Sequence, residues 1–210
     1  MKIAKLEPSA RKKGCWLVFL EDDTLLRVSE QELVDFSLYT GKELDENARK
    51  ALEDAAQRTA HRTYALDLLA AAPLSTAQLI RRLEKRGCPH EEALSMTQRL
   101  TELGYLNDAL YAETLVRHYA AKGYGTYKIR DELYRRGVPK ELWDATLETF
   151  DDPTEALDAL LAKKLRGADP NDPKVLKQAG AYLARRGYSW RDISAALRRY
   201  GGDLTEYEGE

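Results

Sequence analysis

The chain has 210 residues, 32% of them charged, and a formal net charge of −2. It contains no run of about 18 apolar residues, so we expect no helix that spans a membrane. Its first residues lack the apolar stretch of a signal peptide. Two cysteines, Cys15 and Cys88, exclude a disulfide-rich scaffold and fit a reducing compartment. We therefore expect a soluble cytoplasmic protein, and helix should dominate because strand-favouring residues become scarce after residue 40.

Residues 1–59 differ in composition from the rest of the chain. Short apolar or alternating runs at 2–6, 15–20 and 24–28 predict a small antiparallel sheet of two or three strands. Ser29 and Glu32 have capping-box spacing, which predicts a short helix that continues to Leu38. A longer polar helix is expected from Asp45 towards Thr59. Together these elements predict an N-terminal module with short antiparallel strands and helices.

Three later segments, 79–89, 129–139 and 179–189, align at a spacing of fifty residues. The aligned columns are one leucine, one arginine and one glycine: Leu83, Leu133 and Leu183; Arg86, Arg136 and Arg186; Gly87, Gly137 and Gly187. A fixed period of this length is typical of helical repeats that stack on one another. The sequence thus predicts a mainly α fold, a tandem array of three three-helix units at 60–103, 104–150 and 151–200, followed by an acidic tail at 201–210.

Capping and glycine signals place the helices within each unit. The first unit should have helices near 61–71, 75–86 and 90–103, with Ser75 and Gln78 at capping-box spacing. The second should have them near 107–121, 125–136 and 139–149, and the third near 174–186 and 189–200 after a first helix that starts near Thr154. The expected core consists of Leu66, Leu69, Leu79, Leu83, Leu100, Leu103, Leu115, Ile129, Leu133, Leu147, Leu157, Leu160, Leu183, Ile193 and Leu197.

Residues that could carry chemistry are scarce. His61, His90 and His118 have no histidine or cysteine at i+3 or i+4, the spacing of a helical metal site. Gly123-Tyr124-Gly125 is too short for a phosphate-binding loop and lacks the Gly-Lys-Ser/Thr that would follow. No acid pair or nucleophile with a base emerges. We therefore expect no enzyme activity, no cofactor and no metal.

Charge is distributed in blocks, and the basic residues are the more informative part. Residues 163–199 hold ten Lys or Arg against three Asp, whereas residues 138–162 hold one Lys against seven acids. This pattern favours a basic surface bounded by acidic ones, although opposite blocks that face each other or water would give the same pattern. The residues predicted to bind a partner or DNA are Arg81, Arg82, Lys85, Arg86, Lys128, Arg130, Arg135, Arg136, Arg185 and Arg186.

An alternative explains each of these residues singly, because Lys or Arg near a helix C-terminus also offsets the helix dipole. Dipole compensation requires one charge per helix rather than several, so the recurring set favours an anionic polymer as partner. Tyr119, Tyr124, Tyr127 and Tyr134 could stack on bases, although packing of their rings within the unit is the favoured explanation.

One stretch resembles a known family. The motif Leu103-Gly104-Tyr105-Leu106-Asn107-Asp108, followed by Tyr111-Ala112, is similar to the RecX family, bacterial regulators of the RecA recombinase. The same resemblance extends to Glu132-Leu133 with Arg136-Gly137-Val138, to the Ser-x-x-Gln-Leu and Leu-x-x-Arg-Gly arrangement of 75–87, and overall to about residues 60–200.

The resemblance implies an array of three-helix units that binds the RecA filament on single-stranded DNA and has no cofactor. It would inhibit the ATPase, recombinase and coprotease activities of that filament, and would thereby act in DNA repair, recombination and the SOS response. Direct contact with single-stranded DNA and a monomeric state are further expectations.

Two other functions remain open from the sequence. A three-helix unit with a basic helix is compatible with a helix-turn-helix protein that prefers one duplex site. A helical-repeat scaffold for a protein partner is the third alternative, and its activity should survive charge reversal of Arg81, Arg82, Arg135 and Arg136.

Overall fold

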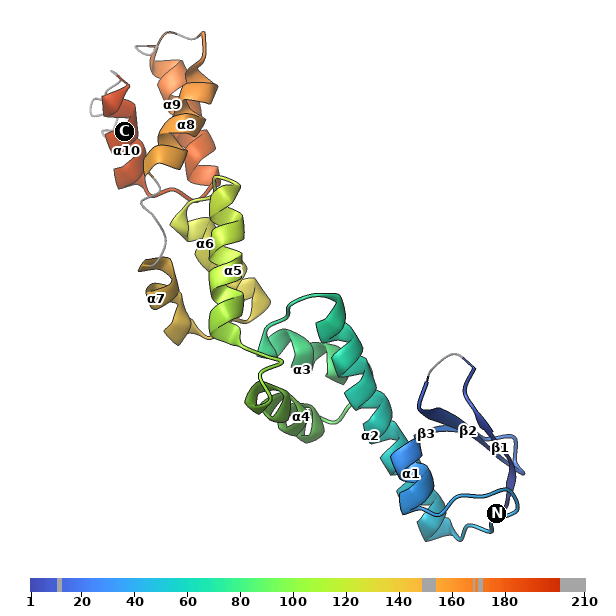
Figure 1. Ribbon diagram of the computed structural model, residues 1–210. Helices are drawn as coiled ribbons and strands as arrows, with labels where there is room; N and C mark the ends of the chain where they lie inside the picture. Colours follow the sequence, from blue (N-terminus) through green and yellow to red (C-terminus); the bar gives the residue numbers. More distant parts are fainter. Residues whose placement is uncertain (11–12, 149–153, 168, 170–171, 201–210) are drawn as a thin grey trace. The chain divides into compact units, whose positions relative to one another are not determined.

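The structure, a computed structural model, describes residues 1–10, 13–148, 154–167, 169 and 172–200 (Figure 1). The described part of the chain is mainly helical, with a small antiparallel sheet near its N-terminus, which confirms the predicted fold class. The predicted acidic tail and the first residues of the predicted third unit lie outside the described residues. The chain divides into two compact units. One comprises Met1–Ala72 with Leu79–Gln98, and the other comprises Pro73–Gln78 with the chain from Arg99 onward.

The N-terminal sheet consists of β1 (Ile3–Pro8), β2 (Cys15–Leu20) and β3 (Leu25–Ser29), antiparallel and in that order. Alternation of side chains along a strand gives the sheet one apolar face. That face carries Ile3, Val18, Leu20 and Val28, all nearly inaccessible to solvent, and packs on Leu52 and Ala56 of the following long helix.

Helix α1 (Glu30–Asp35) begins as the sequence predicts. The Ser29 hydroxyl accepts a hydrogen bond from the Glu32 amide, and the Glu32 carboxylate accepts one from the Ser29 amide. Glu32 is buried and its other carboxylate oxygen accepts a 2.6 Å hydrogen bond from the Thr59 hydroxyl. The capping box therefore also attaches α1 to the long helix.

Helix α2 (Glu46–Ala71) is a single helix of 26 residues that begins at an Asp45 cap. The predicted break between a helix ending at Thr59 and another starting at His61 is wrong. No glycine or proline interrupts 46–71, and alanine-rich sequence propagates helix without a break. The domain boundary placed between residues 59 and 60 consequently falls inside α2.

Helices α3 (Thr76–Lys85) and α4 (His90–Glu102) follow close to their predicted positions. Gly87 separates them with φ of 89°, a left-handed conformation that residues with a Cβ adopt only with strain. The predicted capping box at the start of α3 is present, because Ser75 and Gln78 exchange hydrogen bonds of 3.2 and 3.1 Å.

The second bundle contains α5 (Asp108–Ala121), α6 (Thr126–Arg136), a short 3-10 helix (Lys140–Leu142) and α7 (Trp143–Glu148). The Asn107 side chain caps α5, as predicted. The helix predicted at 139–149 starts instead as the 3-10 turn. Tyr111, Leu115, Ile129, Leu133 and Val138 are among the buried residues that form the core between these helices.

The third bundle contains α8 (Thr154–Leu165), α9 (Pro173–Arg185) and α10 (Trp190–Arg199), seen together in Figure 1. Leucine and isoleucine at helical spacing fill its core, including Leu157, Leu161, Leu183, Ile193 and Leu197. Most predicted core residues are buried across the chain, but Leu66 is 39% exposed and Leu103 is 52% exposed.

Successive repeats meet through the same pair of positions. The amide of Gly125, at the start of α6, donates a 2.9 Å hydrogen bond to the carbonyl of Arg186, at the end of α9. Fifty residues earlier the Ser75 hydroxyl, at the start of α3, donates a 2.5 Å hydrogen bond to the carbonyl of Arg136, at the end of α6. The sequence period of fifty is therefore also a period of contacts.

Candidate functional site

The repeated Leu-x-x-Arg-Gly sequence ends the second helix of each repeat in the same way. Gly87, Gly137 and Gly187 have φ of 89°, 72° and 86°. In the second repeat the Gly137 amide donates to the carbonyls of Leu133 and Tyr134, which closes the last turn of α6. The helix end therefore presents a pair of basic residues just before each glycine.

The two members of the basic pair have different environments. Lys85, Arg135 and Arg185, which come two residues before the glycine, are all exposed. Arg135 pairs with Glu132 at 3.0 Å, but its side chain remains 69% exposed. Arg82 on α3 is also exposed, as is Arg81, which has interactions of its own. These five cations are accessible within the part of the chain that the structure describes.

Arg136, directly before Gly137, is engaged inside its own bundle. Its guanidinium donates hydrogen bonds to the hydroxyls of Tyr111 at 3.0 Å and Tyr119 at 3.5 Å, both on α5, and lies 3.7 Å from the Glu132 carboxylate. The hydrogen bond with Tyr119 raises the pKa of Arg136 above its ordinary value, so the group is charged at every accessible pH. Arg136 thus holds α6 against α5.

Arg186, the equivalent residue of the third repeat, reaches the preceding bundle. Its Nη1 donates to the carbonyls of Lys122 at 2.8 Å and Gly123 at 3.0 Å, the free carbonyls at the end of α5. The centre of its guanidinium lies 5.2 Å from the Tyr124 ring and 5.3 Å from the Tyr182 ring. Both the carbonyls at a helix C-terminus and nearby aromatic rings stabilise a cation.

Arg86, the equivalent residue of the first repeat, lies over Tyr64 of α2, with 4.9 Å from the guanidinium to the ring centre. It borders a hollow of about 310 Å³ that is also lined by Lys13, in the turn between β1 and β2, and by Arg27 on β3. Arg86 is exposed, so it combines a packing contact with access to solvent.

Helix α6 carries the two remaining predicted residues. Lys128 is half-buried and lies 4.0 Å from the Glu132 carboxylate. Arg130 forms a 2.7 Å ion pair with Asp144 of α7. In each pair the nearby carboxylate offsets the positive charge, and both cations remain partly accessible to solvent.

The four predicted tyrosines separate into two groups. Tyr119 and Tyr124 pack against the core of the second bundle, with ring centres 5.7 Å apart. Tyr127 and Tyr134 on α6 are 62% and 69% exposed, and their spacing of seven places them on one face of the helix. An exposed aromatic face beside the exposed Arg135 is an arrangement that suits base stacking or a protein partner.

The histidines are less isolated in space than in sequence. The Nδ1 of His90 lies 2.6 Å from a Glu84 carboxylate oxygen. His61, buried on α2, lies 3.1 Å from Glu92 of α4, and Cys88 is close to both. This group is not apparent in the sequence because His61 is 27 residues from Cys88; the four-residue spacing of Cys88 and Glu92 is the one local signal.

In the described ranges no helix is long and apolar enough to cross a membrane.

Comparison with known proteins gives matches over most of the chain. Family models described as the second and third three-helix domains of RecX match residues 107–147 and 151–197. A regulatory protein RecX of Ectopseudomonas mendocina (strain ymp) is 39% identical over 138 residues, which cover 65% of this chain and 92% of that protein. Another, of Pseudomonas savastanoi pv. phaseolicola, is 37% identical over 143 residues, or 68% of this chain and 92% of that protein.

Solved structures show the same fold. A crystal structure of regulatory protein RecX has a TM-score of 0.70 at 23% identity and covers 94% of this chain and 98% of its own. RecX from Lactobacillus salivarius has a TM-score of 0.65 at 18% identity, covering 70% of this chain and 98% of its own. Because relatives more than 30% identical are covered over nine-tenths of their length, the chain belongs to the RecX family of regulatory proteins.

Proposed function

We propose that this chain is a regulator without catalysis of its own, which binds the RecA filament on single-stranded DNA and inhibits its ATPase, recombinase and coprotease activities. Membership of the RecX family supports this proposal, since the relatives carry the name of regulatory proteins. The described residues also offer exposed cations and aromatic side chains on helix surfaces, which suit binding better than bond-breaking chemistry.

The observation that carries the proposal is the recurrence of one contact at a spacing of fifty residues. Ser75 with Arg136, and Gly125 with Arg186, connect the start of one second helix to the end of the next. Equivalent side chains of successive repeats are therefore presented by equivalent local structures. A ligand that itself repeats, such as a protein filament on a nucleic acid, can be contacted by each repeat in turn.

Among the predicted contact residues, the exposed ones are assigned to the partner surface. They are Arg81, Arg82, Lys85 and Arg86 on the first repeat, and Arg135 and Arg185 on the second and third, with the partly exposed Lys128 and Arg130 also on α6. Arg136 and Arg186 support this surface by fixing the helix ends that carry Arg135 and Arg185. Binding to a phosphate backbone through these cations should weaken as salt rises.

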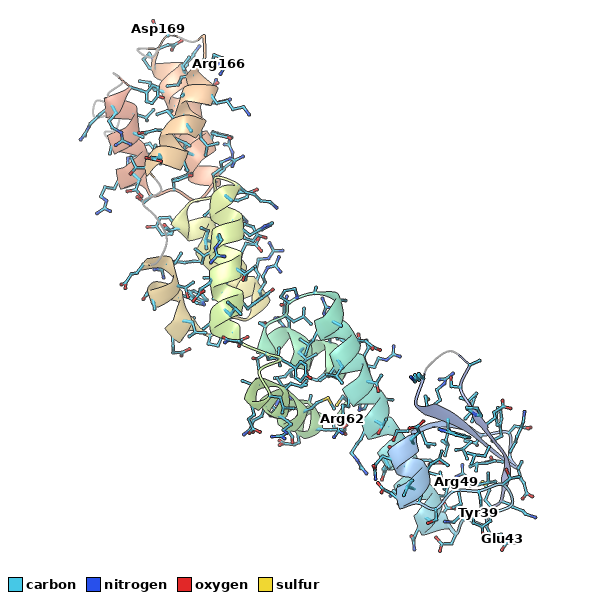
Figure 2. The ribbon with its side chains drawn as sticks, in the orientation of Figure 1. Tyr39, Glu43, Arg49, Arg62, Arg166 and Asp169 are labelled. Atoms are coloured by element: carbon cyan, nitrogen blue, oxygen red, sulfur yellow. The ribbon has the colours of Figure 1, made fainter. Side chains whose placement is uncertain are left out.

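The experiment compares two double charge reversals on preformed RecA–single-stranded DNA filaments. Arg135→Glu with Arg185→Glu alters the assigned surface, and Arg62→Glu with Arg166→Glu removes the same charge from exposed positions outside it, both labelled in Figure 2. We expect the first pair to raise the concentration that halves the DNA-dependent ATPase at least tenfold, which corresponds to about 1.4 kcal/mol. The second pair should change it less than threefold.

The outcomes separate the proposal from the two alternatives. If wild-type protein leaves the filament ATPase unchanged at equimolar ratio in low salt, the proposal fails. A strong preference for one duplex sequence in a random-site selection would support a helix-turn-helix function instead. Inhibition that survives charge reversal of Arg81, Arg82, Arg135 and Arg136 together would indicate a scaffold that contacts the protein through other surfaces.

A further inference from the structure

Three side chains with metal-binding atoms meet inside the N-terminal unit. His61 lies on α2, one residue before the Arg62 labelled in Figure 2, and is 4% exposed. Cys88, between α3 and α4, is also 4% exposed, and Glu92 in the first turn of α4 is half-buried. One ligand atom from each, the imidazole nitrogen, the thiol sulfur and a carboxylate oxygen, lies within 4.8 Å of the other two.

The turn between α3 and α4 brings two of the three together. Gly87 adopts its left-handed conformation, and the next amide, of Cys88, donates a 3.1 Å hydrogen bond back to the Leu83 carbonyl. This closed turn directs the chain into α4, so that Cys88 and Glu92, four residues apart, lie on one side of it. The His61 Nδ1, from the middle of α2, faces the Glu92 carboxylate at 3.1 Å.

The chemistry of this set is that of zinc. Imidazole nitrogen, thiolate sulfur and carboxylate oxygen are its three protein ligand types, with bonds of about 2.0–2.3 Å. In a tetrahedral site such bonds place the ligand atoms about 3.3–3.6 Å from one another. The distance from His61 Nδ1 to Glu92 is close to this range, and the Cys88 sulfur lies within 4.8 Å of both other ligand atoms.

Charge balance in the loaded site would suit a dication. With Zn²⁺ bound, a thiolate at Cys88 and the carboxylate of Glu92 would supply two negative charges, so that the buried group would be neutral. Buried charges are retained where a partner of opposite charge compensates them, and metal coordination is one such compensation.

We propose that His61, Cys88 and Glu92 form a Zn²⁺ site that cross-links α2 to the turn between α3 and α4, with water as the fourth ligand. On binding, the S–H bond of Cys88 breaks, a Zn–S bond forms and the proton passes to solvent. His61 binds through the Nδ1 lone pair, with its proton on Nε2. The site is independent of the proposed regulation, because none of its residues belongs to the assigned partner surface.

The test uses the full chain, stripped with a chelator and dialysed against Zn²⁺ or Co²⁺. We expect one metal ion per chain by elemental analysis and a higher Tm with Zn²⁺. Co²⁺ should give visible d–d bands of tetrahedral coordination together with near-ultraviolet charge transfer from thiolate to cobalt. Loss of a residue that merely orients a ligand costs 10- to 100-fold in affinity, so loss of a ligand should cost at least about 100-fold.

Matched variants identify the ligands. Cys88→Ser, His61→Ala and Glu92→Gln should each lose the bound metal, and Cys88→Ser should lose the charge-transfer band in particular. Cys15→Ser and His90→Gln, which alter the other cysteine and an exposed histidine paired with Glu84, should behave as wild type. Far-ultraviolet circular dichroism of each metal-free variant verifies that it is folded.

Two results would overturn the proposal. Wild-type protein without stoichiometric metal after dialysis would show that the three residues form a hydrogen-bonded cluster in which Glu92 accepts from His61 and the thiol. Charge transfer that persists in Cys88→Ser, or disappears in Cys15→Ser, would place the metal elsewhere.

Discussion

The backbone amide of Gly125 donates a 2.9 Å hydrogen bond to the carbonyl oxygen of Arg186, and this contact joins the second bundle to the third. The adjacent amide of Tyr127 donates to the Gly187 carbonyl at 3.0 Å. Two backbone segments approach this closely because both carry glycine. A Cβ on Gly125 would lie 2.3 Å from the Gly187 oxygen, and a Cβ on Gly187 would lie 2.3 Å from the Lys128 nitrogen.

Replacing Gly125 with alanine should therefore weaken the joint between these bundles. The φ of Gly125 is −80°, which any residue tolerates, so the cost arises from the backbone clash alone. We expect Gly125→Ala to lower the free energy of unfolding by about 1–3 kcal/mol, the usual cost of overpacking. Urea unfolding followed by circular dichroism measures it.

The control is Gly180→Ala, which alters another glycine of the compact unit that runs from Arg99 onward. Gly180 lies within α9, and its added Cβ would be 3.4 Å from the nearest Trp190 carbon, an ordinary contact. Alanine in a helix interior is favoured over glycine by about 1 kcal/mol, so this variant should match or exceed wild-type stability. Equal losses in both variants would contradict a close-approach role for Gly125.

Loss of charge at the two adjacent arginines of α6 should affect different properties. We expect it to lower stability at Arg136 and to weaken filament inhibition at Arg135. Arg136→Gln removes hydrogen bonds from a cation to the Tyr111 and Tyr119 hydroxyls, and should cost about 1.5–3 kcal/mol. Arg135→Gln removes an exposed ion pair with Glu132, and should cost less than about 0.5 kcal/mol. Filament inhibition should show the reverse order once both variants are compared at a temperature where they are folded.

The free energy of unfolding of the two variants, measured in parallel, tests the predicted difference in stability. A double variant of Arg136→Gln with Tyr119→Phe should lose less than the sum of the single changes, because both remove one contact. Additive losses would indicate that Arg136 acts through some other group.

The period of fifty residues predicted much of this architecture, and the physical reason is clear in the core. Leu83, Leu133 and Leu183 are all 0% exposed, so each repeat buries its marker leucine in the same way. Helix caps were predictable as well, because capping depends on residues three positions apart. Ser29 with Glu32 and Ser75 with Gln78 both form the hydrogen bonds that their spacing predicts.

The roles of the repeated arginines could not be predicted from sequence. The acceptors of Arg186 lie 64 and 63 residues away, at the end of another helix, and those of Arg136 lie 25 and 17 residues away. Local charge patterning shows that a cation is present, but not whether a carbonyl, a ring or solvent faces it. The proposed partner surface therefore leaves out Arg136 and Arg186, whose guanidinium groups make these contacts.

The error at residues 59–61 has a different origin. Composition changes there because α2 packs against the sheet through Leu52 and Ala56 in its first half and carries the buried His61 and Ala65 in its second half. A change of packing partner alters composition without ending the helix. Only a helix-breaking residue ends it, and none occurs before Pro73.

The exposed tyrosines of α6 should contribute to binding rather than to stability. Tyr127→Ala combined with Tyr134→Ala should weaken binding to the RecA–DNA filament at least tenfold, since each stacked base contributes about 1–3 kcal/mol. The free energy of unfolding should change by less than about 0.5 kcal/mol, because both rings are more than 60% exposed.

Tyr39→Ala provides the comparison, because Tyr39 is 61% exposed on the sheet module and is labelled in Figure 2. It should leave filament affinity, measured by fluorescence anisotropy of labelled DNA, at the wild-type value. If Tyr39→Ala weakens binding as much as the α6 pair does, the aromatic contacts to the filament are not confined to α6.

Cys88 should make stability depend on pH in the alkaline range of the metal-free protein. Burial, together with the nearby Glu92 carboxylate, raises the pKa of the Cys88 thiol from 9.0 to about 11. The folded state therefore binds this proton more tightly than the unfolded chain does. Its stabilising contribution is complete below pH 9 and is lost as pH rises through 11. A rise in pKa from 9.0 to about 11 corresponds to about 3 kcal/mol of stability.

Comparison of wild type with Cys88→Ala, both in chelator, isolates this contribution from other alkaline titrations. The wild-type free energy of unfolding should fall relative to the variant between pH 9 and 11, by up to about 3 kcal/mol. Cys15→Ala should instead run parallel to wild type across this range.

Because Cys88 is buried and protonated at pH 8, an alkylating reagent should modify the half-buried Cys15 first. Parallel stability curves for wild type and Cys88→Ala would mean that the thiol is solvated in the folded chain, and equal alkylation rates at the two cysteines would point to the same conclusion.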